Sequence, residues 1–592
     1  MRCQVGRLWQ ERSKPILRHC CSILWPIWRG DERKLKVPAV TNELVNVGFR
    51  LSATARQIPD AVGVVQPLGR DATGKRVYRH LSFAELDHDT DAIAAGLQEI
   101  GIRPGMRIAL MVRPGIDFIA LVFAMFKAGV VTILIDPGMG RKNLVKCLDE
   151  AEPEGFVAIS LAQAIRKLLP HRFRNARYNV TVGRRWFWGG PTLDRLRAMP
   201  PEDFKPSRTT ASDPAAIIFT TGSTGPPKGV LYRHGNFNMQ VEQLREYYDI
   251  RPGEIDVPGF PLFALFNAAM GVTTVIPDMD FTRPADVDPR NIVEAIHDWN
   301  ATQAFGSPAL WNTVGRYCED NDVTLSTLRR VLSAGAPVPP HVLRRMKDAI
   351  HPEGDVHTPY GATESLPVAS IAASVVLTET AEQSVRGKGT CVGSRFTGIR
   401  WKVIKIDDGP LADMSQVEEL SRGEIGELMV QGRVVTSEYV TRTDANAFHK
   451  VRDGDLFWHR MGDVGYLDDQ DRFWFCGRKS HRVEGVQGTM FTIPCEAIVN
   501  QHAKVYRSAL VGVGEPHRQL PVVIVETWPE HRPQSPQEEK QLLAELWELV
   551  KSNSLTNPVH DILLHPSLPV DIRHNAKIFR EKLAVWAAER LR

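Results

Sequence analysis

A buried strand that runs into a loop rich in glycine and hydroxyl groups constrains this chain more than any other feature. The apolar residues Ala215–Phe219 precede Thr220-Thr221-Gly222-Ser223-Thr224-Gly225-Pro226-Pro227-Lys228-Gly229. Glycines let a backbone approach phosphate closely, hydroxyl groups donate hydrogen bonds, and Lys228 supplies a cation, so this segment predicts a polyphosphate-binding loop. It is not a Walker A loop, because Pro227 and Gly229 stand where that motif has Gly and Ser or Thr. Plain surface turns share this composition, so other motifs must decide.

The size, charge and cysteine pattern of the chain limit the classes of protein to consider. Its 592 residues exceed one ordinary hydrophobic core and predict several lobes. The net charge of +4 is small, and no long basic run interleaved with aromatic residues is present. Nucleic acid is therefore not expected as a partner, and a small-molecule substrate is. The eight cysteines show neither CxxC pairs nor Cys/His spacing, which argues against zinc and disulfides and predicts a reducing, cytoplasmic location.

The first forty residues differ from the rest. They are basic and contain one short apolar cluster, Ile23–Trp28. Pro26 and Arg29 interrupt the core that a signal peptide would need. We expect residues 1–40 to form a poorly ordered extension, with a peripheral membrane arm as the alternative.

The apolar run Ile116–Ile135 has about the length of a membrane span. Lys127 and Gly129 interrupt it. A helix over Phe118–Phe126, a turn, and a buried strand over Val130–Ile135 explain the same residues better, so no transmembrane segment is expected.

Periodicity predicts an α/β protein with several subdomains. A helix over Phe83–Ile100 and a strand over Arg107–Val112 begin a βαβ rhythm, and Met199–Pro214 is typical of a loop. After Gly477 the pattern changes to an α+β arrangement with strands Ala509–Val513 and Val522–Trp528 and a helix Gln537–Ser552. We expect a large domain over 41–476 and a small one over 477–592.

Further short motifs follow the loop in a fixed order. They are Ser333-Ala334-Gly335-Ala336-Pro337, Tyr360-Gly361-Ala362-Thr363-Glu364, Gly426-Glu427-Leu428, Met461-Gly462-Asp463, Gly477-Arg478, and Lys577 within Pro569–Ile578. With the Thr220–Gly229 loop, they resemble the motifs of the adenylate-forming superfamily of acyl-CoA synthetases, luciferases and peptide-synthetase adenylation domains. The resemblance covers most of the chain from about Thr41. It implies activation of a carboxylic acid by ATP, with an acyl-AMP intermediate, and a mobile C-terminal domain that rotates about Gly477–Ser480.

The resemblance also implies a nucleotide site. Loop residues Thr220, Thr221, Gly222, Ser223, Thr224, Gly225 and Lys228 would hold phosphates, and Ala334, Gly335, Ala336 and Gly361 would lie beside adenine. The ring of Tyr360 would stack on that base. Asp463, supplemented by Arg478, would accept hydrogen bonds from the ribose hydroxyls.

Three residues would carry the chemistry in this reading. Thr363 would donate to the α-phosphate, and Glu364 offers a hard oxygen ligand for Mg²⁺. Lys577 would neutralise charge that develops between the carboxylate and the α-phosphate. Taken singly, Glu364 could be a solvated turn carboxylate, Asp463 a capping residue and Lys577 an exposed lysine before a terminal helix. Arg573 and His574 remain open between substrate contact and surface charge.

The acyl-binding region departs from the general family pattern. A PLFH-like segment of many acyl-CoA synthetases is replaced by Pro261-Leu262-Phe263-Ala264, so Phe263, Ala264 and Phe266 are predicted to shape the substrate pocket. Ser480 replaces the usual acidic hinge residue, and residues 483–488 only loosely match the glycine motif that shapes the thiol-accepting state. Both differences weaken the case for CoA.

In detail, the amino-acid sequence resembles those of the olefin-biosynthesis β-lactone synthetases. The segments that carry this resemblance are Ile276–Pro284, Phe305–Leu310 and Thr358–Glu364. It implies a 2-alkyl-3-hydroxy fatty acid whose own hydroxyl displaces AMP, a step helped by the high effective molarity of an intramolecular nucleophile. It also implies an assembly with thiolase-like, reductase and lactone decarboxylase proteins.

The sequence leaves other functions open. A fatty acyl-CoA or acyl-AMP ligase would share every nucleotide-binding residue. A non-catalytic scaffold is disfavoured by the intact Lys228, Glu364, Asp463 and Lys577. A dehydrogenase has little support because His517 stands where the third glycine of a dinucleotide fingerprint would be.

Overall fold

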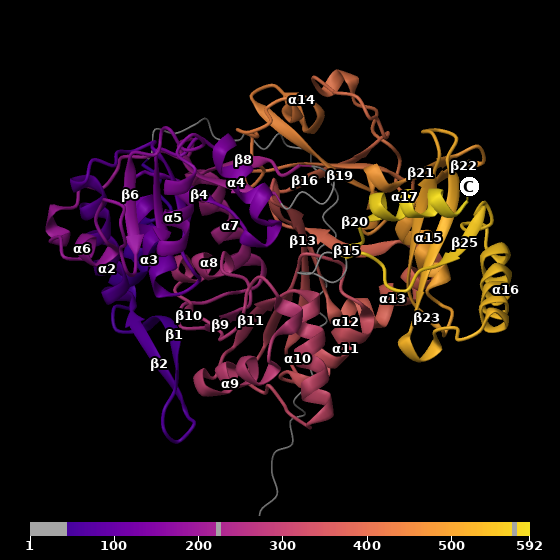
Figure 1. Cartoon of the computed structure of the whole chain (residues 1–592), viewed down its shortest axis with the longest axis horizontal. Helices are drawn as coiled ribbons and strands as arrows, with labels where there is room; N and C mark the ends of the chain where they lie inside the picture. The colour runs from indigo at the N-terminus through magenta and orange to yellow at the C-terminus, as the bar shows by residue number, and fades with distance from the viewer. Residues whose placement is uncertain (1–43, 221–225, 571–576, 592) are drawn as a thin grey trace, which may run out of the picture. The chain divides into compact units, whose positions relative to one another are not determined.

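The computed structural model describes residues 44–220, 226–570 and 577–591, so the predicted extension 1–40, the loop residues Thr221–Gly225, and Arg573 and His574 lie outside the described residues. The described chain is an α/β structure of two large sheets and a smaller C-terminal sheet (Figure 1). In the six-stranded sheet, all neighbours are parallel except the last pair. Its strands in spatial order are β6 (Tyr178–Val182), β5 (Gly155–Ile159), β3 (Arg107–Met111), β4 (Val131–Leu134), β7 (Pro214–Phe219) and β8 (Gly229–Arg233).

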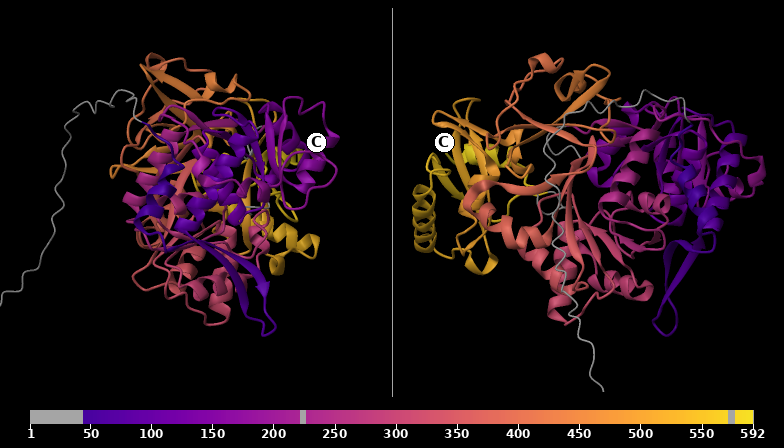
Figure 2. Two further views of the ribbon diagram at one scale, coloured as in Figure 1. Left: turned by 90° about the vertical axis from the view of Figure 1, so that its left-hand side faces the viewer. Right: turned by 180° about the vertical axis from the view of Figure 1, so that it is seen from behind.

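The second sheet is mixed. It is parallel from β1 to β13 and antiparallel beyond, and β1 and β2 extend as a hairpin (Figure 2). Its order is β16 (Arg400–Ile404), β17 (Gly426–Gln431), β19 (Leu456–Leu467), β20 (Arg472–Arg478), β15 (Thr390–Arg395), β14 (Ser365–Ala372), β13 (Asp355–Ala362), β12 (Arg330–Ser333), β11 (Gln303–Gly306), β9 (Ile255–Pro258), β10 (Thr273–Val275), β1 (Val62–Arg70) and β2 (Arg76–Ser82), with β18 (Lys450–Asp453) on β19. Parallel strands align their carboxyl ends, which positions the motif loops together.

Helices connect and cover these sheets. Those used below are α1 (Phe49–Gln57), α2 (Phe83–Glu99), α3 (Ile116–Lys127), α4 (Arg141–Glu150), α5 (Ser160–Leu168), α7 (His234–Tyr247), α8 (Phe263–Met270), α10 (Pro308–Asp320), α11 (Pro340–Ala349) and α14 (Ala445–His449); α6 (Leu193–Arg197), α9 (Pro289–Trp299), α12 (Ala373–Val375) and α13 (Ala381–Gln383) complete this part. The predicted loop 199–214 contains only a 3₁₀ turn before β7. Helix α2 begins with a capping box, in which Ser82 accepts from the Glu85 N–H and Glu85 accepts from the Ser82 N–H.

The apolar run 116–135 forms a core helix and a core strand, as predicted. All residues of α3 except Asp117 are buried. Lys127, which interrupts the run, has no exposed side-chain surface, and its Nζ donates to Asp87 at 2.5 Å and Asp91 at 2.6 Å. A buried ammonium needs such paired carboxylates. None of the helices described combines the length and apolar character that crossing a bilayer requires.

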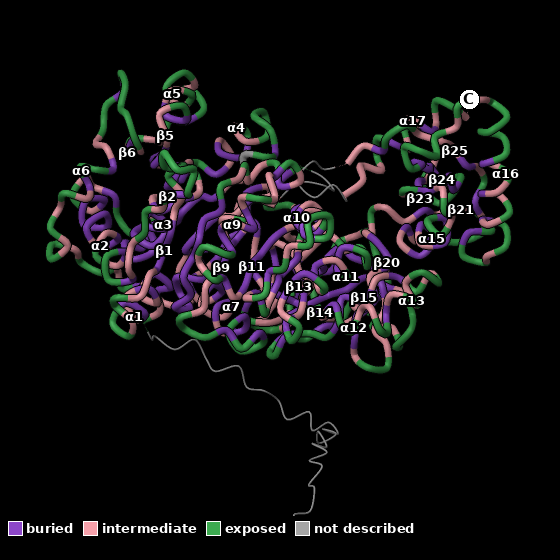
Figure 3. The backbone as a smooth tube through the Cα atoms, turned by 90° about the horizontal axis from the view of Figure 1, so that it is seen from below, coloured by how far each residue is buried: buried purple, intermediate pink, exposed green. Residues whose placement is uncertain are grey.

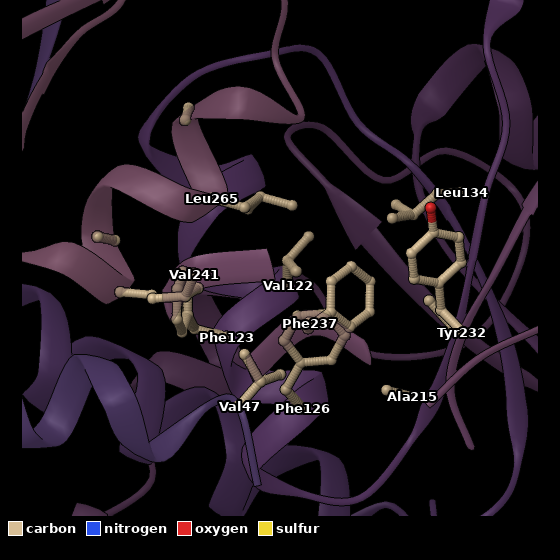
Figure 4. Close-up of a cluster of buried hydrophobic side chains, with 14 of the residues drawn as sticks. Val47, Val122, Phe123, Phe126, Leu134, Ala215, Tyr232, Phe237, Val241 and Leu265 are labelled. Atoms are coloured by element: carbon tan, nitrogen blue, oxygen red, sulfur yellow. The ribbon is translucent and has the colours of Figure 1, made fainter. Parts of the chain in front are cut away.

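The centre of the core lies where α3 meets α7 and α8. Phe126 and Phe237 pack at 5.4 Å between ring centroids, and Val122 and Leu265 lie beside them (Figure 4). Tyr232 stacks on Phe237 at 4.9 Å. Aromatic packing of this kind joins the six-stranded sheet to α7, which packs against α8, the helix that carries the predicted acyl-pocket residues.

The C-terminal residues form a small α+β unit, as the periodicity predicts. Strands β23 (Val505–Val513) and β24 (Leu520–Thr527) pair antiparallel, and β25 (Asp561–Leu564) joins β24 in parallel. A short ribbon and three helices complete it, namely β21 (Val483–Gly485), β22 (Gly488–Met490), α15 (Thr492–Val499), α16 (Pro536–Ser552) and α17 (Arg580–Arg590). Its own buried cluster includes Leu510, Val523 and Leu546, which shows that these elements share a core.

Candidate active site

One cavity of about 2210 Å³ collects most of the predicted site residues. Sites for single small ligands are typically about 300–1,000 Å³, so this cavity has room for two substrates. Of the predicted residues, those lining it are Thr220, Lys228, Phe263, Phe266, Ala334, Gly335, Ala336, Tyr360, Gly361, Thr363, Glu364, Asp463, Arg478 and Lys577.

Asp463 on β19 and Arg478 on β20 face each other across the strand pair. Arg478 Nη1 donates to Asp463 Oδ1 at 2.6 Å, and the hydroxyl of Tyr360 donates to Oδ2. Burial, reinforced by the neighbouring Asp463 carboxylate, raises the pKa of Tyr360 well above its usual value, so the phenol stays protonated and donates. The Tyr360 ring forms part of the cavity wall. These two hydrogen bonds fix the orientation of the Asp463 carboxylate at the cavity wall.

Glu364 follows β13 and is held by two neighbouring residues. Tyr439 Oη donates to Glu364 Oε1 at 2.5 Å, while Thr436 donates through its N–H and its hydroxyl to the Glu364 carbonyl at 2.9 and 3.0 Å. Oε2 has no hydrogen-bond partner among the residues that the structure describes. Glu364 therefore presents one fixed carboxylate oxygen at the cavity wall. The carbonyl of the adjacent Thr363 accepts a hydrogen bond from Tyr232 Oη at 2.6 Å.

Lys228 stands at the base of the predicted phosphate loop. Its N–H donates to Thr220 Oγ1, and its carbonyl accepts from the Thr220 N–H, both at 3.0 Å, which closes the loop between β7 and β8. The Nζ lies 3.3 Å from His449 Nε2 and 5.0 Å from the centroid of the Tyr439 ring. Burial lowers the pKa of Lys228, with Glu364 opposing that effect.

His449 is neutral beside this lysine. Its Nδ1 lies 3.4 Å from the carbonyl of Arg460, which can only accept, so Nδ1 carries the proton and Nε2 accepts from Lys228. Burial, with a smaller effect of Lys228, lowers the pKa of His449 to about 4. The neutral imidazole of His449 thus fixes the position of the Lys228 ammonium group through a hydrogen bond and adds no like charge beside it.

The predicted adenine-side loop follows β12, at the carboxyl end of a parallel strand. Gly335 adopts a φ of 101°, a conformation that favours glycine and that turns the loop along the cavity wall. Lys577 lines the same cavity.

The opposite wall is aromatic. Phe263 stacks on Phe305 with centroids 3.6 Å apart and an interplanar angle of 14°, and Phe266 meets Phe263 edge-on at 5.8 Å. Phe263 is the first residue of α8 and Phe266 lies three residues later, so the two rings share one face of the helix. Ala264 is 1% exposed and belongs to the buried core cluster rather than to the residues lining the cavity. The predicted pocket role of Ala264 is thus not supported by its placement.

Sequence reasoning missed Tyr439, His449 and Tyr232. Each supports a predicted residue from a segment distant in the chain, and no motif in the sequence marks them. The pairing of Val230 with Tyr439 could have been found only from the tertiary structure.

A buried lysine behind the site predicts a pH dependence of stability. Lys450 Nζ donates to the carbonyl of Thr436 at 2.5 Å and lies 5.5 Å from the Tyr439 ring centroid. Burial lowers the pKa of Lys450 to about 7. Between pH about 7 and about 10 the unfolded chain binds this proton and the folded chain does not, so the free energy of unfolding rises with pH there, by up to ~1.4 kcal/mol per unit.

Urea titrations at several pH values measure this slope. We expect Lys450→Met to flatten it and the exposed Lys388→Met to leave it unchanged. An equal slope in the native protein and in Lys450→Met would show that Lys450 titrates normally.

The chain matches the model of the AMP-binding enzyme family over residues 51–440. It is 45% identical over 558 residues to the olefin beta-lactone synthetase of Xanthomonas campestris pv. campestris, covering 92% of this chain and 98% of that protein. It is also 45% identical to the olefin beta-lactone synthetase of Stenotrophomonas maltophilia, and this match covers 93% of this chain and 99% of that protein.

Solved structures share the fold. The amide bond synthetase McbA from Marinactinospora thermotolerans has a TM-score of 0.73 at 21% identity, covering 91% of this chain and 99% of that one. ATP-bound MatB from Rhodopseudomonas palustris has a TM-score of 0.73 at 19% identity, covering 92% and 99%. With a family model that covers well over half of its length, this chain belongs to the AMP-binding enzyme family of adenylate-forming enzymes.

Proposed function

We propose that this chain uses ATP to convert a 2-alkyl-3-hydroxy fatty acid into a β-lactone. The acid's carboxylate oxygen attacks the α-phosphorus and pyrophosphate leaves; the 3-hydroxyl oxygen then attacks the acyl carbon, its proton is lost to solvent or phosphate, and AMP leaves. The observation that carries the proposal is the cavity of about 2210 Å³, which is lined by the carboxylates of Glu364 and Asp463 and by the aromatic ring of Phe263. The 45% identity to two olefin beta-lactone synthetases supports this product over others.

The site residues have separate roles in this reaction. Asp463 and Arg478 bind the ribose, Tyr360 and the 334–336 loop bind adenine, and Lys228 with Thr220–Gly225 binds the phosphates. Thr363 contacts the α-phosphate. Lys577 stabilises charge developing between the two substrates. Phe263 and Phe266 contact the acyl chain and exclude water from the acyl carbon.

Glu364 fits the role of a magnesium ligand. Mg²⁺ in nucleotide sites is held by one or two carboxylates together with phosphate oxygens, and Glu364 offers one oriented carboxylate with Oε2 unengaged by the described residues. No group of three or more metal-ligating side chains occurs in the described part of the chain, which agrees with a metal held largely by ATP. Bound there, Mg²⁺ would neutralise phosphate charge.

Replacing Glu364 with glutamine tests this role. The amide keeps a hydrogen-bond acceptor for Tyr439 but loses the negative charge, so we expect a Mg²⁺ requirement roughly ten- to hundredfold higher. Pyrophosphate exchange measured against Mg²⁺ concentration gives the value, with the exposed Glu382→Gln as control. An unchanged requirement would remove Glu364 from the metal site.

Product analysis tests the proposed function. Purified protein, Mg-ATP and a 2-alkyl-3-hydroxy fatty acid are incubated with and without CoA. We expect a product one water lighter than the acid, formed with AMP and independent of CoA. A thioester that appears only with CoA would instead make the chain an acyl-CoA ligase.

Three further points belong to the proposal. Residues 477–592 rotate about Gly477–Ser480 to bring Lys577 to the substrates. The protein acts in the cytoplasm. It works with thiolase-like, reductase and lactone decarboxylase proteins, which co-purification would test.

A further inference from the structure

Helix α5 turns an apolar stripe toward solvent. Leu161, Ile165 and Leu168, at spacings of four and three, share one face and are 62%, 40% and 73% exposed. On the opposite face, Ala162 and Gln163 are buried. Figure 3 shows α5 as a projecting, largely exposed element. An exposed apolar stripe opposite a face that buries small and polar residues is typical of an interaction surface.

The loop after β6 adds two exposed aromatic side chains to the same region. Trp186 and Phe187 are 51% and 71% exposed. Both pack on the buried Trp188, with ring centroids at 5.4 and 5.1 Å, and Trp188 Nε1 donates to Thr181 Oγ1 at 2.8 Å. The Ser160 hydroxyl donates to the carbonyl of Arg184, which ties this loop to the start of α5. The aromatic pair is thus held out on a rigid base.

The charged side chains of the segment that forms this surface are all basic. Residues 155–193 contain seven Arg or Lys and no Asp or Glu. The seven are Arg166, Lys167, Arg172, Arg174, Arg177, Arg184 and Arg185. Of these, Arg172 pairs with Asp149 at 2.7 Å, and the structure shows no ion pair for the other six among the described residues. The surface formed by α5 and residues 184–187 therefore matches an anionic partner.

The same helix borders the active-site cavity. Ile159, immediately before α5, and Ala162, on its inner face, line the cavity, together with Leu144 of α4. The exposed stripe and the cavity wall are thus opposite sides of one short helix.

We infer that α5 and residues 184–187 dock this protein on an anionic lipid bilayer. The leucine stripe and the aromatic pair enter the boundary between headgroups and acyl chains, and the flanking cations contact lipid phosphates, which is the side-chain distribution of interfacial helices. A protein partner would need an acidic rim around an apolar groove. An anionic bilayer offers negatively charged headgroups beside apolar acyl chains over its whole surface. Lipid binding itself is independent of the proposed function. The further step, in which docking brings the cavity to a water-insoluble acid, rests on the proposed function.

Sedimentation with sucrose-loaded vesicles tests the docking on the full chain without substrate. We expect binding to vesicles of phosphatidylcholine and phosphatidylglycerol in equal parts, weakened at high salt, and little binding to phosphatidylcholine alone. Trp186→Ser/Phe187→Ser should lower the partition coefficient about tenfold, and Leu161→Ser should lower it by a smaller factor. Leu68→Ser, a leucine with the same 62% exposure on β1, is the matched control and should change nothing.

Three outcomes would overturn the inference. Native protein that stays in the supernatant would do so. So would undiminished sedimentation of the Trp186/Phe187 variant, which would assign lipid binding to another segment, such as the basic residues 1–40. A lipid-independent dimer that the variant dissociates, seen by light scattering, would assign the surface to a second copy. Turnover of a short, water-soluble 3-hydroxy acid should be equal in all variants and confirms that they fold.

Discussion

Replacing Lys577 with alanine is expected to slow acyl-adenylate formation by about 10²–10³. Lys577 lines the cavity that also contains Glu364, Asp463 and Arg478. In the attack of carboxylate on the α-phosphate, negative charge accumulates between two anions. A preorganised ammonium stabilises that charge more in the transition state than in the ground state, so the loss should fall on kcat rather than on binding of ATP.

ATP–pyrophosphate exchange measures this step. The control is Lys582→Ala, an exposed lysine on α17 whose Nζ lies 4.7 Å from the Phe579 ring centroid. Lactone formation from synthetic acyl-AMP supplied to Lys577→Ala should remain within a few fold, because the phosphoryl step has already occurred. Exchange at the native rate would show that another cation serves the reaction.

Replacing Glu427 with alanine is expected to lower the free energy of unfolding by about 3–5 kcal/mol. Glu427 and Arg460 have side-chain exposures of 1% and 0%. Glu427 Oε2 accepts from Arg460 Nε at 3.0 Å and Nη2 at 2.6 Å, and from Lys479 Nζ at 3.1 Å. Alanine would leave the Arg460 guanidinium buried without its carboxylate.

Urea denaturation measures the loss. The double variant Glu427→Leu/Arg460→Met removes the fully buried guanidinium together with its carboxylate and should be less destabilised than Glu427→Ala, because only the partly exposed Lys479 then lacks its partner. Equal losses would assign the effect to packing. Since Lys479 lies within the predicted hinge Gly477–Ser480 and pairs with Glu427, the single variant should also alter the kinetics of ATP–pyrophosphate exchange.

The order of motifs predicted much of the site. Thr220, Lys228, Glu364, Asp463 and Lys577 are far apart in the sequence, yet all line one cavity. Local patterns sufficed for α2, α3 and the C-terminal strands, because helical periodicity, a mostly apolar helix and a short run of consecutive β-branched residues depend only on neighbouring residues.

Other features could not be predicted from the sequence. The Tyr439–Glu364 and His449–Lys228 contacts join residues 75 and 221 positions apart, and no local pattern encodes such contacts. Ala264 was expected at the pocket, but its rotation on α8 buries it. The predicted domain boundaries and the roles of the site residues remain predictions.

The sequence by itself determined the family, the order of the site motifs and the elements whose hydrophobic period is local. The tertiary structure decided which side of each element faces the core. On α5, Leu161 and Leu168 would be assigned inward from hydrophobicity, yet β5 and β6 pack against Ala162 and Gln163. Gln163 Nε2 donates to the carbonyls of Phe156 and Val180, so buried hydrogen bonds fixed the orientation of the helix and left the leucines to solvent.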